Sequence, residues 1–245
     1  MNNITIILKI AKDFLLKNAI NLVFLTLAFY YFLSQGRGNS RIPEIIFFDV
    51  GQGDAILVQE GNVQVLIDGG PDDSIVFKLA KEMPPYDKNI EIIILTHPHD
   101  DHIRGLMNVL DEFTVERVFI NKIKYENKVY EELLVEYKDI IMEVAEGDRF
   151  SYGDIEGEII YPILNNGRKK VSQDENINNE SVVTLLDIKG KKILLMGDAE
   201  YEVEYKLLKE LSFENIYILK AGHHCSRTAT SDMVLREVLL DSSAG

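Results

Sequence analysis

The sequence predicts an α/β protein in which layers of helix cover mixed β-sheets. Short apolar runs rich in β-branched residues recur from residue 45 to residue 219, and helical stretches lie between several of them. Many of these runs end in glycine, aspartate or histidine, which is typical of strands that lead into loops. Strands interspersed with helices favour a layered architecture with mixed sheets.

The elements can be assigned in order along the chain. Alternating or continuous apolar runs predict strands at residues 45–50, 55–59, 63–67, 91–95, 115–120, 140–144, 155–161, 181–188, 192–196 and 215–219. Helical spacing predicts helices of about ten residues from Asp73, and at residues 101–113, 130–137 and 202–211. Residues 165–179 are polar and mixed in charge, so we expect a loop there.

The chain length and an amino-terminal apolar stretch predict three parts: a segment at residues 1–35, a linker at 36–43 and one domain of catalytic size at 44–245. Residues 19–33 carry no charge, which predicts a single membrane anchor, with a slight bias of lysines that favours a cytoplasmic amino terminus and an extracytoplasmic domain. The alternatives are a cleaved signal peptide and a buried helix of a soluble protein.

The charge of the chain limits its partners. The formal net charge is -14, which argues against a sequence-independent nucleic-acid binder, because such proteins neutralise phosphates with lysine and arginine. A polyanionic substrate would need bound divalent cations to offset its charge. The single cysteine, Cys225, excludes an intrachain disulfide.

The histidines are confined to two clusters. The chain has 5 histidines, of which three lie within residues 97–102 (HPHDDH) and two are adjacent at residues 223–224. Neutral imidazole binds transition metals, so the clustering predicts one metal site to which both segments contribute.

The first cluster follows a predicted strand directly. Its spacing permits His97 and His99 to bind one metal, and Asp101 and His102 to bind a second. Nitrogen and carboxylate ligands of this kind suit Zn²⁺, and suit Mn²⁺ or Fe²⁺ as the carboxylate content grows. We expect Asp100 to be solvated or to support a ligand.

Three further segments supply chemistry at strand ends. Asp198 follows the apolar run ILLMG, where a carboxylate could bridge two metals. Asp68, in IDGG, is expected to orient a ligand by hydrogen bonding. Of His223 and His224, one is expected to bind metal, while the other orients substrate or shuttles protons.

Six motifs in this order resemble the metallo-β-lactamase superfamily and, within it, the ComEC-type hydrolase domain of DNA-uptake competence proteins. They are FFDVGQGDA, VLIDGG, LTHPHDDHIRGL, the NxxSVV stretch from Asn178, ILLMGDAE and LKAGHHCS. The resemblance implies an αββα sandwich with a dinuclear centre between the sheets. His97 and His99 would bind one metal, Asp101, His102 and His223 the other, and Asp198 both. Many relatives have a third histidine at the first metal, where this chain has the stretch from Asn178 to Ser181.

The resemblance also implies an activity. It implies two divalent ions, Zn or Mn, and hydrolysis of phosphodiesters, with single-stranded DNA a candidate, by a metal-bridging water. The catalytic residues expected beside the metals are Asp101 and His224, and those expected to contact substrate or support the ligands are Asp54, Asp68, Asn178, Ser181 and Ser226. The alternatives are a small-molecule phosphodiesterase, such as a phosphocholine-type esterase, and a non-catalytic binding module that kept the fold.

The chain departs from the family pattern at two places. Cys225 stands where glycine usually follows the paired histidines. The chain ends at Gly245, where such domains continue with a strand, a Gly-His-Pro-like motif and a helix. We therefore expect the domain to be incomplete at its carboxyl end, without its last strand and helix.

Overall fold

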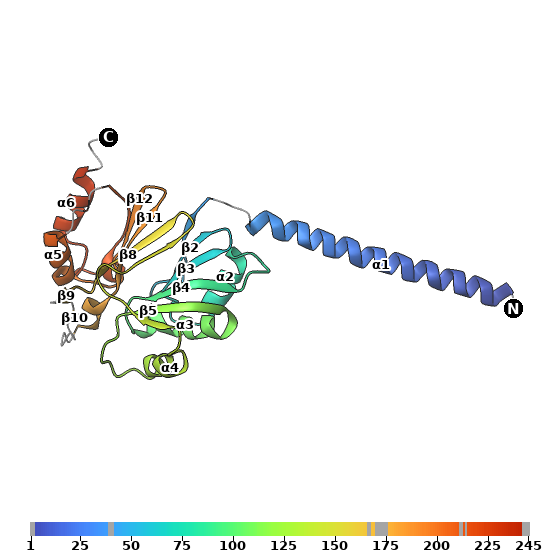
Figure 1. The fold of residues 1–245 in the computed structure, drawn as a ribbon, viewed down its shortest axis with the longest axis horizontal. Helices are drawn as coiled ribbons and strands as arrows, with labels where there is room; N and C mark the ends of the chain where they lie inside the picture. Colours follow the sequence, from blue (N-terminus) through green and yellow to red (C-terminus); the bar gives the residue numbers. More distant parts are fainter. Residues whose placement is uncertain are drawn as a thin grey trace.

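The computed structural model describes residues 3–38, 42–165, 168–169, 176–210, 213 and 215–241. Within these residues the strands form a six-stranded sheet, a five-stranded sheet and a two-stranded hairpin. Helix α1 (Asn3–Gly38) extends away from the layered domain that the strands build (Figure 1). The functional site must therefore be sought in the domain.

The six-stranded sheet forms first along the chain, in the order β1-β2-β3-β4-β5-β6. The pairs β1–β2 and β2–β3 are antiparallel, whereas β3 to β6 pair in parallel. Parallel neighbours need crossover connections, which the three helices of this half supply. The elements are β1 (Glu44–Phe47), β2 (Ile56–Glu60), β3 (Val63–Ile67), α2 (Ser74–Glu82), β4 (Asn89–Leu95), α3 (Asp100–Glu112), β5 (Thr114–Ile120), α4 (Lys128–Glu136) and β6 (Ile141–Glu143).

The five-stranded sheet has the order β13-β12-β11-β8-β7, and only its β12–β13 pair is parallel. Helix α5 connects those two strands. The elements are β7 (Arg149–Tyr152), β8 (Ile155–Tyr161), β9 (Leu164–Asn165), β10 (Arg168–Lys169), the 3₁₀ turn η1 (Ile177–Glu180), β11 (Val183–Ile188), β12 (Lys191–Leu195), α5 (Tyr201–Glu210), β13 (Ile216–Lys220), the 3₁₀ turn η2 (Gly222–Cys225) and α6 (Asp232–Asp241).

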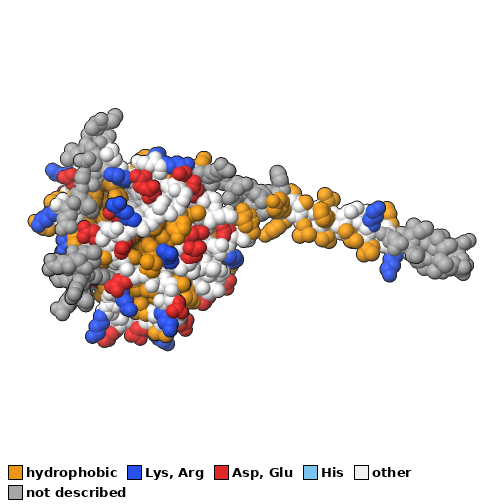
Figure 2. All heavy atoms as spheres, viewed as in Figure 1, with side chains coloured by type: hydrophobic (Ala, Val, Ile, Leu, Met, Phe, Trp, Pro, Cys, Tyr) orange, Lys and Arg blue, Asp and Glu red, His pale blue; other side chains and the backbone are white. Residues whose placement is uncertain are grey.

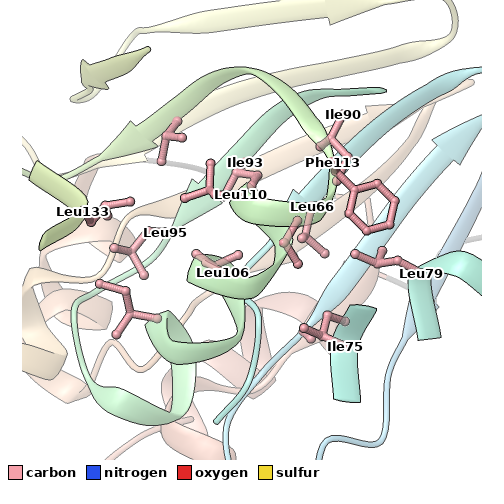
Figure 3. Packing of buried hydrophobic residues seen from close by; sticks show 14 of the residues in the cluster. Leu66, Ile75, Leu79, Ile90, Ile93, Leu95, Leu106, Leu110, Phe113 and Leu133 are labelled. Carbon is pink, nitrogen blue, oxygen red and sulfur yellow. The ribbon is translucent and has the colours of Figure 1, made fainter. Parts of the chain in front are cut away.

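Alternate residues of the strands face different layers. Leu66, Ile93 and Leu95 pack against α2 and α3 on the outer face of the first sheet (Figure 3). Ile92 and Ile94 point the other way, into an apolar layer shared with the second sheet. Helix α5 covers the outer face of the second sheet through a third apolar cluster. Each fully buried aliphatic side chain contributes about 1.5–3 kcal/mol, so the three layers stabilise the αββα sandwich together.

This architecture confirms the predicted fold class and most of the predicted elements. The bounds predicted for strands at residues 63–67 and 155–161 agree with β3 and β8. The prediction of a loop at residues 165–179 is wrong in part, since β10 and η1 fall within it, while residues 166–167 and 170–175 lie outside the described residues. Strand β7 and helix α6 were not predicted.

The membrane anchor predicted at residues 19–33 is not supported. Over the described part of the chain, no helix combines the length and the apolar character needed to cross a membrane. Those side chains of α1 that the structure describes are exposed, and Figure 2 shows that many of them are apolar. The predicted extracytoplasmic position depended on that anchor.

Candidate metal centre

The carboxyl ends of β4, β12 and β13 meet at one edge of the sandwich. The loop after β4 and the first turn of α3 carry the first histidine cluster, the turn after β12 carries Asp198, and η2 after β13 carries the second histidine pair. Contacts between these segments span the two sheets, so the centre lies between them. The sequence prediction that the clusters converge is borne out by this geometry.

His97 and His99 face each other on the β4 side of the centre. His97 Nε2 lies 3.0 Å from His99 Nδ1 and 3.8 Å from Asp198 Oδ2. Burial lowers the pKa of His97 well below its usual value and lowers that of His99, so both rings are neutral at pH 7. Two nitrogens about 3 Å apart can both reach one ion at the usual bond length of about 2 Å.

His102 is held by a buried carboxylate behind it. Its Nδ1 lies 2.8 Å from Asp68 Oδ2, while Asp68 also accepts hydrogen bonds from the backbone and hydroxyl of Thr96 at 2.8 and 2.7 Å. Burial disfavours a charge on His102, but the negative charges of Asp68 and Asp198 outweigh it and raise its pKa to about 10. Asp68 thus lies where a carboxylate would fix the ring orientation of a metal ligand.

Asp198 lies at the middle of the centre. Its Oδ2 is 3.4 Å from His102 Nε2 and 3.3 Å from His224 Nε2. Burial alone would raise the pKa of this carboxyl, but its close interactions with the imidazoles of His102 and His224 lower it far below its usual value. The backbone N–H of Asp198 donates to Ser181 Oγ at 3.0 Å, so the predicted residue Ser181 supports the strand end.

The structure reverses the predicted positions of the paired histidines. His224, predicted to be catalytic, is the ring that faces Asp198, and its Nε2 also lies 3.8 Å from Asp101 Oδ2. His223, predicted to be a ligand, turns instead to Glu200, with Nδ1 2.9 Å from Oε1. The backbone explains the difference: His223, His224 and Cys225 all have positive φ, so the chain winds left-handed through η2 and directs the second ring inward.

The remaining predicted residues lie at different distances from the centre. Asp101 is half-buried, with Oδ1 4.0 Å from His102 Nε2. Asn178 donates to Glu200 at 3.2 Å and lies beside His223. Ser226 forms a turn with Thr228, and its backbone N–H donates to the carbonyl oxygen of His223 at 2.7 Å. Asp100 is exposed and pairs with Arg104 at 2.7 Å, as expected of a solvated carboxylate.

One residue, Lys220, extends the centre beyond the predicted set. Lys220, at the end of β13, forms an ion pair with Asp54 and donates to the carbonyl of Gly197 at 2.7 Å. Asp54 in turn lies 3.6 Å from His224 Nδ1. Asp54 was predicted as a supporting residue, but Lys220 was not assigned a role. The signal for Lys220 was its position at the end of a β-rich run, three residues before the histidine pair.

A glycine lets the β1–β2 loop approach the first histidine cluster. Gly53 has φ of +88°, and a Cβ added there would lie 1.8 Å from the carbonyl oxygen of Asp101. No side chain fits this gap, so the Gly-Gln-Gly-Asp sequence brings Asp54 to the centre by close backbone contact.

The residues fit a divalent metal. One atom from each of Asp54, His102, Asp198 and His224 lies within 4.8 Å of the others. His102 Nε2 is buried and lacks a hydrogen-bond partner among the described residues, although its ring is fixed from behind by Asp68. A buried polar atom without a partner is costly, and a metal ion would satisfy this one.

Comparison with known proteins agrees with this geometry. The family model described as Metallo-beta-lactamase superfamily matches residues 48–243. The chain is 27% identical over 222 residues to ComE operon protein 3 of Bacillus subtilis, covering 80% of this chain and 27% of that protein. It is 26% identical over 197 residues to Recombination protein 2 of Haemophilus influenzae, covering 79% and 23%. Both are ComEC-type competence proteins, and the chain spans about a quarter of their length.

Among solved structures, a metallo-β-lactamase with a HARLDQ motif from Cronobacter sakazakii matches with a TM-score of 0.51 at 12% identity, over 86% of this chain and 95% of that one. This likeness concerns the fold alone. With the family model extending over the whole sandwich and its ligand segments, the chain belongs to the metallo-β-lactamase superfamily.

Proposed function

We propose that this protein is a metal-dependent hydrolase that cleaves phosphodiesters with two divalent ions, Zn or Mn. The observation that carries the proposal is the convergence of His102 Nε2 and His224 Nε2 on one oxygen of Asp198, with His97 Nε2 also within 3.8 Å of that oxygen. A carboxylate oxygen surrounded by imidazoles from two sheets is suited to join two metal positions.

Each metal position would draw on its own set of side chains. His97 and His99 would hold the first ion, and Asp101, His102 and His224 the second, with Asp198 shared. Bound ions would lower the pKa of water and offset negative charge on a phosphate group. That second effect matters in this chain, because a formal net charge of -14 otherwise repels phosphate substrates.

His223 is assigned to the substrate side of the centre. Glu200 accepts a hydrogen bond from its Nδ1, and the ring is about one-third exposed. A carboxylate that fixes Nδ1 leaves the rest of the imidazole to contact a substrate oxygen or to hold a proton for it. From the residues alone, this role fell to one member of the pair without a choice between them, whereas the family resemblance gave it to His224.

The test combines metal analysis with hydrolysis assays on the full chain. Purified protein should contain two equivalents of Zn or Mn, and should hydrolyse bis(4-nitrophenyl) phosphate and single-stranded DNA when either metal is present. A protein that binds metals without hydrolysing any phosphodiester would be the non-catalytic binding module instead. A protein that binds no metal would refute the proposal.

A small-molecule phosphodiesterase is the second candidate within the enzyme class. The acidity of the chain favours it, because small diesters carry little charge and need no basic surface. The two candidates differ in salt dependence. If DNA inhibits the hydrolysis of small diesters, such as phosphocholine esters, only weakly, the second candidate is favoured. If DNA inhibits it efficiently at low salt, the first candidate is favoured.

A further inference from the structure

The strongest unassigned feature is the buried lysine at the end of β13. The side chain of Lys220 is only 10% exposed and lies beside two carboxylates of the metal centre. A lysine is rarely buried to this degree unless it is paired. It belongs to none of the motif roles that the sequence assigns to metal ligands or catalytic groups.

Three oxygens surround the ammonium group of Lys220. It forms ion pairs with Asp54 Oδ2 and, at 3.6 Å, with Asp198 Oδ1, and it donates a hydrogen bond to the carbonyl oxygen of Gly197 at 2.7 Å. The ammonium is therefore held between two carboxylates and a backbone carbonyl. Such a lysine is placed to hold neighbouring groups rather than to bind a substrate.

The same contacts join segments from both sheets. Asp54 follows the β1–β2 turn of the first sheet, whereas Gly197, Asp198 and Lys220 follow strands β12 and β13 of the second. The ammonium thus ties a loop of one sheet to two strand ends of the other. Ligands from both sheets can share one metal only if these segments keep their positions relative to one another.

The two oxygens of each carboxylate are divided between the lysine and a metal position. Asp198 turns Oδ1 toward Lys220 and Oδ2 toward the histidines. Asp54 turns Oδ2 toward Lys220 and Oδ1 toward His224 Nδ1, 3.6 Å away. Asp54 therefore stands behind His224 as Asp68 stands behind His102, and a carboxylate behind a ligating histidine fixes the ring and raises its basicity.

We propose that Lys220 is a positioning residue that fixes Asp54 behind His224 and Asp198 across the two metal positions, and so sets the affinity of the second position. The inference rests on the proposed function for the identity of the metal centre. It assigns to Lys220 and Asp54 a role in metal binding rather than in contact with substrate. Asp54 pairs with Lys220 and His224 rather than with His97 or His99, so the first position should not depend on the pair.

The test is a metal titration of the metal-stripped full chain, without substrate, using Mn²⁺ or Zn²⁺ and calorimetry with elemental analysis. Wild type should bind two ions. Lys220→Met and Asp54→Asn should each weaken the second ion by about 10–100-fold and leave the first unchanged. The double variant should be no worse than either single variant, because both changes break one unit. Lys191→Met, on the exposed start of β12, is the matched control and should bind as wild type.

The outcomes separate the inference from its alternatives. The inference would be overturned if Lys220→Met binds the second ion with an affinity within threefold of wild type, or more tightly. Lys220 would then be a structural residue, or would merely repel the metal. If Lys220→Met fails to fold by circular dichroism, Asp54→Asn and Lys220→Arg carry the test, and Arg should retain part of the affinity. Failure of wild type to hydrolyse phosphodiesters would refute the proposed function while the titration still decides the role of Lys220.

Discussion

The two halves of the metal centre are built in different ways. The first sheet supplies His97, His99, Asp101 and His102 from one segment of six residues, which spans the loop after β4 and the first turn of α3. The second sheet supplies its groups from separate strand ends after β12 and β13. The first half is therefore encoded in a local stretch of sequence, whereas the second half exists only once the sheet has formed.

The halves also differ in how firmly they hold a ligand. The side chain of His102 is 0% exposed and its Nδ1 lies 2.8 Å from Asp68, whereas the side chain of His224 is 30% exposed and its Nδ1 lies 3.6 Å from Asp54. The ring of His102 is therefore held in place by the protein alone, whereas the ring of His224 is held less tightly. Stability should therefore depend on the first half, and metal affinity on the second.

The largest effect is expected where the halves share an atom. Asp198→Asn replaces the carboxylate whose Oδ2 faces three imidazoles, so both metals should be lost and hydrolysis should fall roughly 10²-fold or more. Elemental analysis and turnover of bis(4-nitrophenyl) phosphate measure this. Asp139→Asn, on the exposed α4–β6 connection, is the control. Wild-type metal content in Asp198→Asn would show that the two halves do not share a ligand.

A smaller effect is expected at the loop that brings Asp54 toward the first half. Gly53→Ala must place a methyl group against the carbonyl of Asp101 at positive φ, which should cost about 3 kcal/mol or more. Gly51 also has positive φ but nothing within 4 Å, so Gly51→Ala should cost only about 1–2 kcal/mol. Urea unfolding compares the two variants. Equal losses would mean that the close approach to Asp101 is not needed.

The pH dependence of the stability of the metal-free protein should report on His102, in the first half. His102 has a pKa of about 10 in the folded protein and an ordinary value of 6.5 when unfolded. The folded state therefore keeps a proton that the unfolded chain releases. This contribution to stability is complete below pH 6.5 and is lost as the pH rises from 6.5 through about 10.

Urea midpoints measured with a chelator across that range should fall with pH, and a His102→Gln variant should give a flatter profile. Saturating metal should reverse the slope, because the ion competes with the same proton. Midpoints of the chelated wild type that rise between pH 6.5 and 10 would contradict the assigned direction of the His102 shift.

The smallest effect is expected at Cys225, at the end of the η2 turn in the second half. Cys225 is exposed and has φ of 63°, a conformation that glycine adopts without strain. Cys225→Gly should stabilise the protein by about 0.5–1 kcal/mol, while Cys225→Ala, which keeps the Cβ, should change stability by less than about 0.5 kcal/mol. Thermal unfolding distinguishes them, and a gain in Cys225→Ala would mean that the thiol rather than the backbone is unfavourable.

Most of the fold was predictable because strand alternation and helix spacing are local signals. Buried strands such as β3 and β8 read as continuous apolar runs and were located correctly. Strand β7 was missed because Phe150 is its only buried residue, so it has no apolar run to detect. Helix α6 did carry a signal, the spacing of Val234 and Val238, that was not used.

The centre was predictable in its first half and only partly in its second. The spacing of residues 97–102 pointed to metal without any structure. The choice between His223 and His224 could not be made, because it depends on three consecutive left-handed residues that local preferences disfavour. Lys220 was missed because lysine is solvated in most proteins, and only the three-dimensional fold places it beside Asp54.

The partial exposure of His224 bears on how a bound metal would leave the centre. The imidazoles of His97 and His102 are buried, whereas His224 and Asp101 are partly exposed, so an ion held among them has its path to solvent past these two side chains. Exchange with a chelator should then follow the opening rate of the η2 turn rather than the rate of global unfolding. The residence time of the second ion would then depend on how long the four-residue turn η2 stays closed.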